Sequence, residues 1–333
     1  MRENPILSLP KDEGDDGGSM ITGIDHVAIL VRDFDATVKS YETIFGRAPN
    51  WLGFMPGGRH AWFQFDGMAL DIIGSDGTGP EADASRAEIA KFGDAIWGLG
   101  FSVPDLDAAT RLFERRGLNF LPRHTTRTTN ASGATRSWEV AVIKRKSAHG
   151  VALFLVENKP AASPWPVAPP KVADEAAVST LDHIVVNTTH PERATALYGA
   201  RLALDLRLDR TNEQWGARQL FFRCGQSIVE VGANLKLPPG DAPDTFGGLA
   251  WRVRDPESAR ARIAAAASMC RRYARGASLA HPCSRCAVGP VASRPSCSPA
   301  TNERSQSGPA DFSSGFCLSA TFAMSSRRMN SAR

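Results

Sequence analysis

The stretch Ile24–Val31 (IDHVAILV), which continues into Arg32–Asp35 (RDFD), decides the fold of this chain. It returns as Leu181–Val186 (LDHIVV). Each copy predicts a short strand rich in β-branched residues, with a histidine near its start and a helix after it. Weaker copies begin at Trp97 and Gly248. Four strand-then-helix units therefore follow one another along the chain.

Length and hydropathy set the first limits. A chain of 333 residues can hold two domains with ordinary cores. No apolar run approaches the roughly 20 residues that a membrane helix needs. The acidic N-terminal segment lacks the basic-then-apolar order of a signal peptide. We expect a soluble cytoplasmic protein that does not enter a membrane.

Charge and cysteine are unevenly distributed. The net charge is +4, but residues 268–333 hold nine arginines against Glu303 and Asp311, a net of +7, which leaves about −3 for the rest. A mildly acidic body argues against a nucleic-acid partner, which would need a basic face. Cys224 is the only cysteine before residue 270, so the body is not a disulfide scaffold.

Residues 21–75 predict a β-α-β-β-β unit. The helix is expected over residues 34–45, with Asp33 as its N-cap and Gly46 as its end, and the later strands near 51–55, 60–65 and 68–73. After a polar stretch over residues 74–92, residues 95–158 repeat the plan. Their helix is expected over 106–116 and their strands near 120–123, 137–144 and 151–156. Together these two units form a predicted first domain, residues 21–158.

The second domain is predicted over residues 179–267. A Pro- and Ala-rich linker, 159–178, precedes it and favours an extended backbone. Residues 179–235 predict a third unit with a helix over 191–198. Residues 247–267 supply only the strand and helix of a fourth, the helix ending near 267. Residues 1–20 are expected to be a disordered leader.

Residues 268–333 do not continue the pattern. They are rich in Ser, Arg, Cys and Pro and show no sustained alternation, which is typical of low-complexity sequence. We interpret the change as an altered reading frame near Met269, with the native ending lost and a tail that we expect to be disordered. The fourth unit would then lack three strands and leave an open sheet edge.

These repeats resemble the vicinal oxygen chelate superfamily, which includes glyoxalase I, methylmalonyl-CoA epimerase, the bleomycin and fosfomycin resistance proteins and the extradiol dioxygenases. The likeness rests on Ile24–Ile29, Leu181–Val186 and Ala148–Leu153. It implies an α+β fold of four βαβββ modules, paired into two cup-shaped mixed-sheet domains, with the fourth module incomplete.

The resemblance also implies a divalent metal, Fe, Zn, Mn, Ni or Mg, in each cup. In the family, a histidine at the start of a module's first strand and a carboxylate on its last strand hold the ion. The matching metal ligands here are His26, Asp71, His183 and Glu230. Gly98 and Gly248 stand where further histidines belong, and Phe154 stands where a further carboxylate belongs. Each cup therefore keeps half of a four-ligand site.

Other side chains are expected to face the cups. Strand alternation turns Arg252 inward, where a buried guanidinium needs an anionic partner, either Glu230 or a substrate anion. Gly98 and Gly100 should leave the first cup roomy. The other expected substrate-binding residues are Arg59, His60, Trp62 and Trp138.

Two functions remain open from the sequence. One is a glyoxalase-like, metal-assisted lyase, isomerase or ring-cleaving dioxygenase acting on a small oxygenated organic or aromatic substrate. The other is a non-catalytic, drug-sequestering binding protein of the bleomycin-resistance type. The sequence also leaves open whether the domains pair within one chain or across a homodimer.

Overall fold

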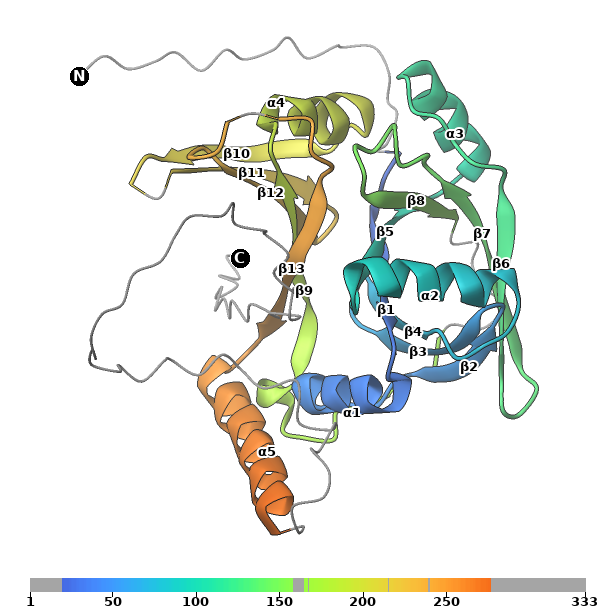
Figure 1. Cartoon of the computed structure of the whole chain (residues 1–333), viewed down its shortest axis with the longest axis vertical. Coiled ribbons are helices and arrows are strands. Elements are labelled where there is room, and N and C mark those ends of the chain that lie inside the picture. Colours follow the sequence, from blue (N-terminus) through green and yellow to red (C-terminus); the bar gives the residue numbers. More distant parts are fainter. Residues whose placement is uncertain (1–19, 158–164, 167, 215, 239, 277–333) are drawn as a thin grey trace, which may run out of the picture.

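A computed structural model describes residues 20–157, 165–166, 168–214, 216–238 and 240–276 (Figure 1). Nearly all of the expected leader lies outside the described residues. Residues 277–333 also lie outside the described residues, and they make up most of the segment 268–333 for which a change of reading frame is inferred.

The first two units close into an eight-stranded barrel with the strand order β1-β4-β3-β2-β6-β7-β8-β5. The β1–β4 and β5–β8 pairs are parallel and the remaining pairs are antiparallel. The strands are β1 (Gly23–Val31), β2 (Trp51–Met55), β3 (Gly58–Gln64), β4 (Ala69–Gly74), β5 (Ala95–Val103), β6 (His124–Asn130), β7 (Thr135–Val142) and β8 (Ala152–Glu157).

A second, open sheet lies beside the barrel, with the order β10-β11-β12-β9-β13. Its strands are β9 (Val178–Thr188), β10 (Asp205–Asn212), β11 (Ala217–Cys224), β12 (Ser227–Asn234) and β13 (Thr245–Val253). The matching barrel strand β5 is paired on both sides, whereas β13 is at the sheet edge among the described residues. The α+β fold built from repeated βαβββ modules is confirmed.

Helices follow the first strand of each module. They are α1 (Phe34–Phe45), α3 (Leu106–Arg115), α4 (Pro191–Ala194) with its π-helical continuation η2 (Thr195–Arg201), and α5 (Pro256–Gly276); a 3-10 turn, η1 (Asp174–Ala176), precedes β9. Asp33 and Asp105 cap α1 and α3 by accepting hydrogen bonds from Ala36 N and Ala108 N, at 2.9 and 2.8 Å. Asp33 thus takes the predicted N-cap position.

Three local predictions differ from the structure. The polar stretch contains helix α2 (Pro80–Phe92), which buries only Ala82 and Ile89 and therefore has too narrow an apolar face to be recognised. The strand expected near residues 120–123 is only an isolated bridge from Phe120 to Ile143, and β6 begins at His124. Helix α5 runs to Gly276, beyond its expected end.

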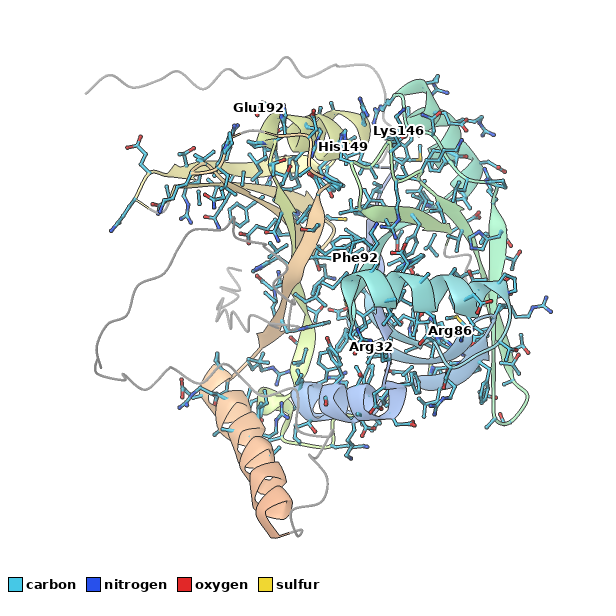
Figure 2. The ribbon with its side chains drawn as sticks, in the orientation of Figure 1. Arg32, Arg86, Phe92, Lys146, His149 and Glu192 are labelled. Carbon is cyan, nitrogen blue, oxygen red and sulfur yellow. The ribbon has the colours of Figure 1, made fainter. Side chains whose placement is uncertain are left out.

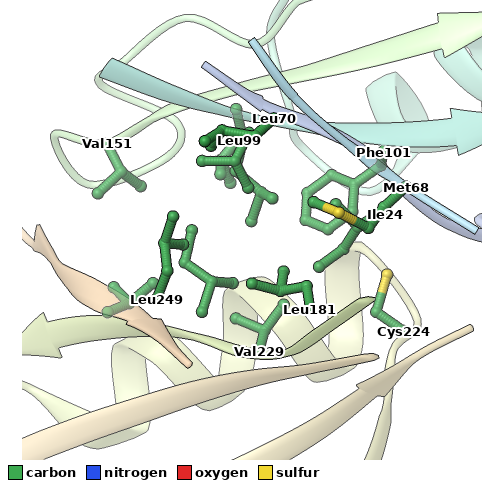
Figure 3. Close-up of a cluster of buried hydrophobic side chains, with 14 of the residues drawn as sticks. Ile24, Met68, Leu70, Leu99, Phe101, Val151, Leu181, Cys224, Val229 and Leu249 are labelled. Carbon is green, nitrogen blue, oxygen red and sulfur yellow. The ribbon is translucent and has the colours of Figure 1, made fainter. Parts of the chain in front are cut away.

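The barrel and the second sheet share one hydrophobic core. Figure 3 shows Ile24 and Phe101 of the barrel facing Leu181 and Val229 of the second sheet. Trp251 of β13 adds an aromatic contact, with its ring 4.7 Å from that of Phe45 at the end of α1. The two sheets therefore pack as one body.

The loop before β8 also meets the second sheet. It carries Lys146 and His149, on the side of the barrel that faces Glu192 of α4 (Figure 2). The His149 carbonyl accepts a hydrogen bond from Asp244 N at 2.8 Å. Within the described residues, no helix combines the length and apolar character needed to span a membrane.

Candidate functional site

Two β-bulges build the same Asp–His pair in both sheets. On β1, His26 lies opposite Gly100 and Ile24 opposite Phe101, so Asp25 has no counterpart on β5. Asp182 of β9 is the extra residue in the same way. A bulge re-aims the side chain of its extra residue. Here each aspartate turns toward the following histidine, with Nδ1–carboxylate distances of 2.6 Å for His26 and 2.9 Å for His183.

A cavity of about 460 Å³ lies over the face of the open sheet that points away from the shared core. His183 Nε2 and Glu230 Oε2 approach to 3.3 Å there, with side chains 19% and 13% exposed. Because β9 and β12 are parallel with Val185 opposite Glu230, the two side chains project from the same face. The cavity is lined by His183, Val185, Asn187, Glu230, Gly247, Gly248, Leu249 and Ala250.

Arg252 acts on His183 through the carboxylate of Asp182. Its Nε donates to Asp182 Oδ1 at 2.7 Å and its Nη2 donates to the Gln226 carbonyl at 3.0 Å. The hydrogen bond with His183, followed by that from Arg252, lowers the pKa of Asp182 to about 2, although burial opposes the shift. The sequence leaves two anionic partners open for Arg252, Glu230 and a substrate anion. The structure gives neither, because the bulge brings the carboxylate of Asp182 to the guanidinium.

Arg210 fixes the position of Glu230 through Gln219. Arg210 Nη2 donates to Gln219 Oε1 at 2.7 Å, and Gln219 Nε2 donates to Glu230 Oε1 at 2.8 Å. The arginine fixes which end of the amide faces Glu230, since only the oxygen can accept from a guanidinium. The second carboxylate oxygen, Oε2, is the one near His183.

The His183–Glu230 pair fits a divalent ion. Two ligand atoms at roughly 2.1 Å from one ion, in tetrahedral or octahedral geometry, lie about 3.0–3.4 Å apart, and the observed separation is 3.3 Å. Asp182 occupies the other ring nitrogen, the arrangement that orients metal-bound histidines. No group of three His, Cys, Asp or Glu side chains gathers within the described part of the chain, so two protein ligands are available.

His26, the barrel residue that matches His183, has different surroundings. The His26 ring is only 5% exposed and packs among aromatic rings, with centroid distances of 4.9 Å to Trp62, 5.0 Å to Phe154 and 6.4 Å to Trp138. Both tryptophans thus face the barrel interior, and their role in substrate binding stays a prediction. The setting of His26 is apolar rather than one rich in ligands.

The glycines of β5 do not leave a roomy cup. A Cβ atom on Gly98 would lie 2.8 Å from the Phe154 ring, and one on Gly100 would lie 2.4 Å from it. Their missing side chains are the space that Phe154 fills. Phe154 therefore closes the barrel at the position where the resemblance implies a carboxylate.

Asp71 is engaged elsewhere in the barrel. His60 bridges Asp71 Oδ1 to Thr128 Oγ1, at 2.8 and 2.5 Å, and the His60 and Asp71 side chains are 0% and 2% exposed. Asp71 lies opposite Ala28, and His26 lies opposite Ala69. The structure thus pairs Asp71 with His60 rather than with His26, and the His60 side chain is buried.

Arg59 lies outside the barrel interior. Its guanidinium bonds the carboxylates of Asp35 and Asp76 and lies 4.6 Å from the Phe34 ring centroid.

Trp165, from the segment between the two sheets, stacks on Trp62, with ring centroids 4.6 Å apart and ring planes at 16°. A further aromatic wall is therefore supplied by a residue that strand alternation does not reach.

Sequence reasoning missed Asp25, Asp182, Gln219 and Asn187. A signal was present for the first two, because the Asp-His dipeptide occurs in both strong copies of the strand. Gln219 gives no such signal, since its partner is set by the pairing of β11 with β12.

The sequence matches the model of a family described as the Glyoxalase-like domain over residues 24–202. No curated protein matches the chain.

Solved structures are similar in fold. A 4-hydroxymandelate synthase mutant from Streptomyces coelicolor is 16% identical, with 74% of this chain and 75% of that chain covered and a TM-score of 0.53. A xylose isomerase-like TIM barrel/4-hydroxyphenylpyruvate dioxygenase fusion protein is 13% identical, covering 75% of this chain and 39% of that chain, with a TM-score of 0.52. A Mn(II)-bound glyoxalase from Novosphingobium aromaticivorans is 14% identical, covering 75% and 71%, with a TM-score of 0.49.

Proposed function

Because the chain belongs to the glyoxalase-like domain family, within the vicinal oxygen chelate superfamily, we propose that it is a metal-assisted enzyme acting on a small oxygenated organic or aromatic substrate. The reaction is a lyase or isomerase step or a ring-cleaving dioxygenation. The divalent ion binds at the second sheet, on His183 and Glu230, rather than in the barrel.

The 3.3 Å approach of His183 Nε2 to Glu230 Oε2, at the wall of a cavity, carries this proposal. Imidazole and carboxylate together suit Fe, Zn, Mn or Ni better than Mg, which prefers oxygen ligands. The barrel offers no equal pair, because His60 engages Asp71 and aromatic rings surround His26.

When bound, such an ion would act as a Lewis acid on substrate oxygens. The residues of the chain prepare the site for it. Asp182 accepts the Nδ1 proton of His183 and so leaves Nε2 as the ligand atom, while Gln219 holds one oxygen of Glu230. Asn187 lines the same cavity with an amide that can position a polar substrate group.

Metal content by elemental analysis tests the proposal. The full-length protein, equilibrated with Mn²⁺, Fe²⁺ or Zn²⁺ and then dialysed, should hold near-stoichiometric metal. His183→Ala and Glu230→Ala should lose it. His26→Ala is the matched control from the barrel and should retain it. Metal retained in His183→Ala, or none in the unmodified protein with any of the three ions, would overturn the proposal.

A specific observation favours binding without catalysis as a second candidate function. Trp165 stacks on Trp62, and the Arg136 guanidinium lies 4.5 Å from the Trp165 ring and 5.1 Å from that of Trp51. Flat rings with a cation beside them suit a planar aromatic acid.

Thermal unfolding with 1-naphthoate tests this second candidate. The ligand should raise the melting temperature of the unmodified protein. It should not do so for Trp62→Ala. Phe54→Ala, which removes an exposed ring from the neighbouring strand β2, should respond like the unmodified protein. An equal shift in Trp62→Ala would exclude the Trp62–Trp165 stack as the binding site.

A further inference from the structure

We propose that Asp182 and Arg252 are positioning residues that set the tautomer of His183. This inference rests on the proposed function, since it concerns how His183 presents Nε2 to the ion. Asp182 receives two donors, one on each oxygen: Arg252 Nε on Oδ1 at 2.7 Å and His183 Nδ1 on Oδ2 at 2.9 Å.

The geometry assigns a direction to each hydrogen bond. A guanidinium can only donate, so Asp182 Oδ1 must accept from Arg252. An ionised carboxylate can only accept, so Oδ2 must receive a proton from His183 Nδ1. In the neutral imidazole the other nitrogen, Nε2, then carries a lone pair. Glu230 Oε2 competes for the ring proton from that side, but it lies 3.3 Å from Nε2, farther than the 2.9 Å between Asp182 Oδ2 and Nδ1.

The barrel repeats the arrangement with one difference. Asp25 holds His26 Nδ1 at 2.6 Å, and Ser102 Oγ donates to the other oxygen of Asp25 at 3.3 Å. Ser102 lies opposite Gly23 on β1, as Arg252 lies opposite Thr180 on β9. The ionised Asp25 also accepts both of its bonds. A hydroxyl can donate or accept, however, whereas a guanidinium cannot accept, so only Arg252 would still impose a direction if the carboxylate were replaced by an amide.

Asp182→Asn makes the role of Arg252 visible. With Arg252 present, the Asn oxygen must face the guanidinium, and the amide NH₂ must therefore face His183 Nδ1. Nδ1 then has to accept, and the ring proton moves to Nε2, where it blocks a metal. In Asp182→Asn/Arg252→Ala the amide is free to turn, so its oxygen can again accept from Nδ1.

The ¹⁵N chemical shifts of the imidazole ring report the tautomer directly in the metal-free, full-length protein, at a pH where the ring is neutral. His183→Gln assigns the signals among the seven histidines. We expect an Nδ1–H ring in the unmodified protein, an Nε2–H ring in Asp182→Asn, and a return to Nδ1–H in the double variant. Asp182→Asn/Arg207→Ala removes a different arginine, which pairs with Asp205 on β10, and should keep the Nε2–H ring.

Metal affinity by calorimetry with Mn²⁺ gives the second readout. Asp182→Asn should weaken binding about 10- to 100-fold, the usual effect of losing such a partner, and Asp182→Asn/Arg252→Ala should recover part of it. An Nε2–H ring in the unmodified protein, or the same tautomer in all variants, would overturn the inference. Absence of Mn²⁺ binding by the unmodified protein would count against the proposed function instead, because the tautomer is read without metal.

Discussion

At the scale of single residues, the barrel interior contains a buried chain of hydrogen bonds between polar side chains. Asp71, His60 and Thr128 lie on three different strands and satisfy one another, with exposures of 2%, 0% and 0%. Removing one member leaves a buried polar partner without a bond, which costs more than the bond itself contributes.

Asp71→Ala is expected to lower the free energy of unfolding by about 3 kcal/mol, because His60 keeps its burial and loses its carboxylate. Denaturant unfolding measures the change. Asp83→Ala, which removes an exposed partner of Arg86 on α2, should cost under ~1 kcal/mol and is the control. A loss for Asp71→Ala as small as that of the control would show that the chain of bonds does not stabilise the barrel.

Tyr198 differs from these three residues, because its buried polar group is not hydrogen-bonded within the described part of the chain. Its ring is fully buried in η2, and among the described residues its hydroxyl has no hydrogen-bond partner. Burial, followed by the nearby Asp244 carboxylate, raises the pKa of Tyr198 above the ordinary value of 10.0. The folded protein therefore keeps the phenol neutral at pH values where the unfolded chain ionises it.

The stability linked to Tyr198 is present below pH 10 and is lost as the pH rises above that value. Tyr198→Phe should raise the free energy of unfolding at neutral pH by about 1 kcal/mol, because no bond is lost and a buried unpaired hydroxyl disappears. Above pH 10, the free energy of unfolding should fall less steeply in the variant than in the unmodified protein. The difference in slope should be roughly 1.4 kcal/mol per pH unit. Parallel pH profiles for the two proteins would contradict this account.

At the scale of elements, Arg262 joins helix α5 to both α1 and η1, beside the burial of Ala259 in the shared core. Arg262 donates to the Thr43 and Ile44 carbonyls at the end of α1 and to the Ala176 carbonyl of η1. Helix α1 has no basic residue in its own last turn. Arg262 therefore supplies the donors that its final carbonyls need, and it joins the last described helix to the first.

Arg262→Ala should lower the free energy of unfolding by about 2 kcal/mol and increase hydrogen exchange in α1 and α5, since three carbonyls lose a donor. Arg260→Ala is the control on the same helix. It removes only an exposed pair with Glu257 and should cost under ~0.5 kcal/mol. Equal effects of the two substitutions would mean that Arg262 does not attach α5.

At the scale of the whole molecule, the barrel and the second sheet cannot be separated without exposing apolar surface, because their buried residues form one cluster. Leu181 of β9 is fully buried within it, beside residues of the barrel (Figure 3). A shared core couples the unfolding of its two parts.

Leu181→Ala should therefore destabilise both parts together, by about 3 kcal/mol. Far-ultraviolet circular dichroism and tryptophan fluorescence should give a single, coincident transition in the variant and in the unmodified protein. Leu237→Ala, at an exposed position, should change little. Two separate transitions would show that the barrel and the second sheet fold independently.

The sequence by itself determined the modules, because alternating strands, aspartate caps and the Asp-His repeat are local signals that tertiary packing did not override. Tertiary structure alone decided the rest. A bulge gave Arg252 to Asp182, strand pairing gave Asp71 to His60, and Phe154 filled the space left by two glycines. Such contacts depend on which strands become neighbours, and a one-residue change of register alters every one of them.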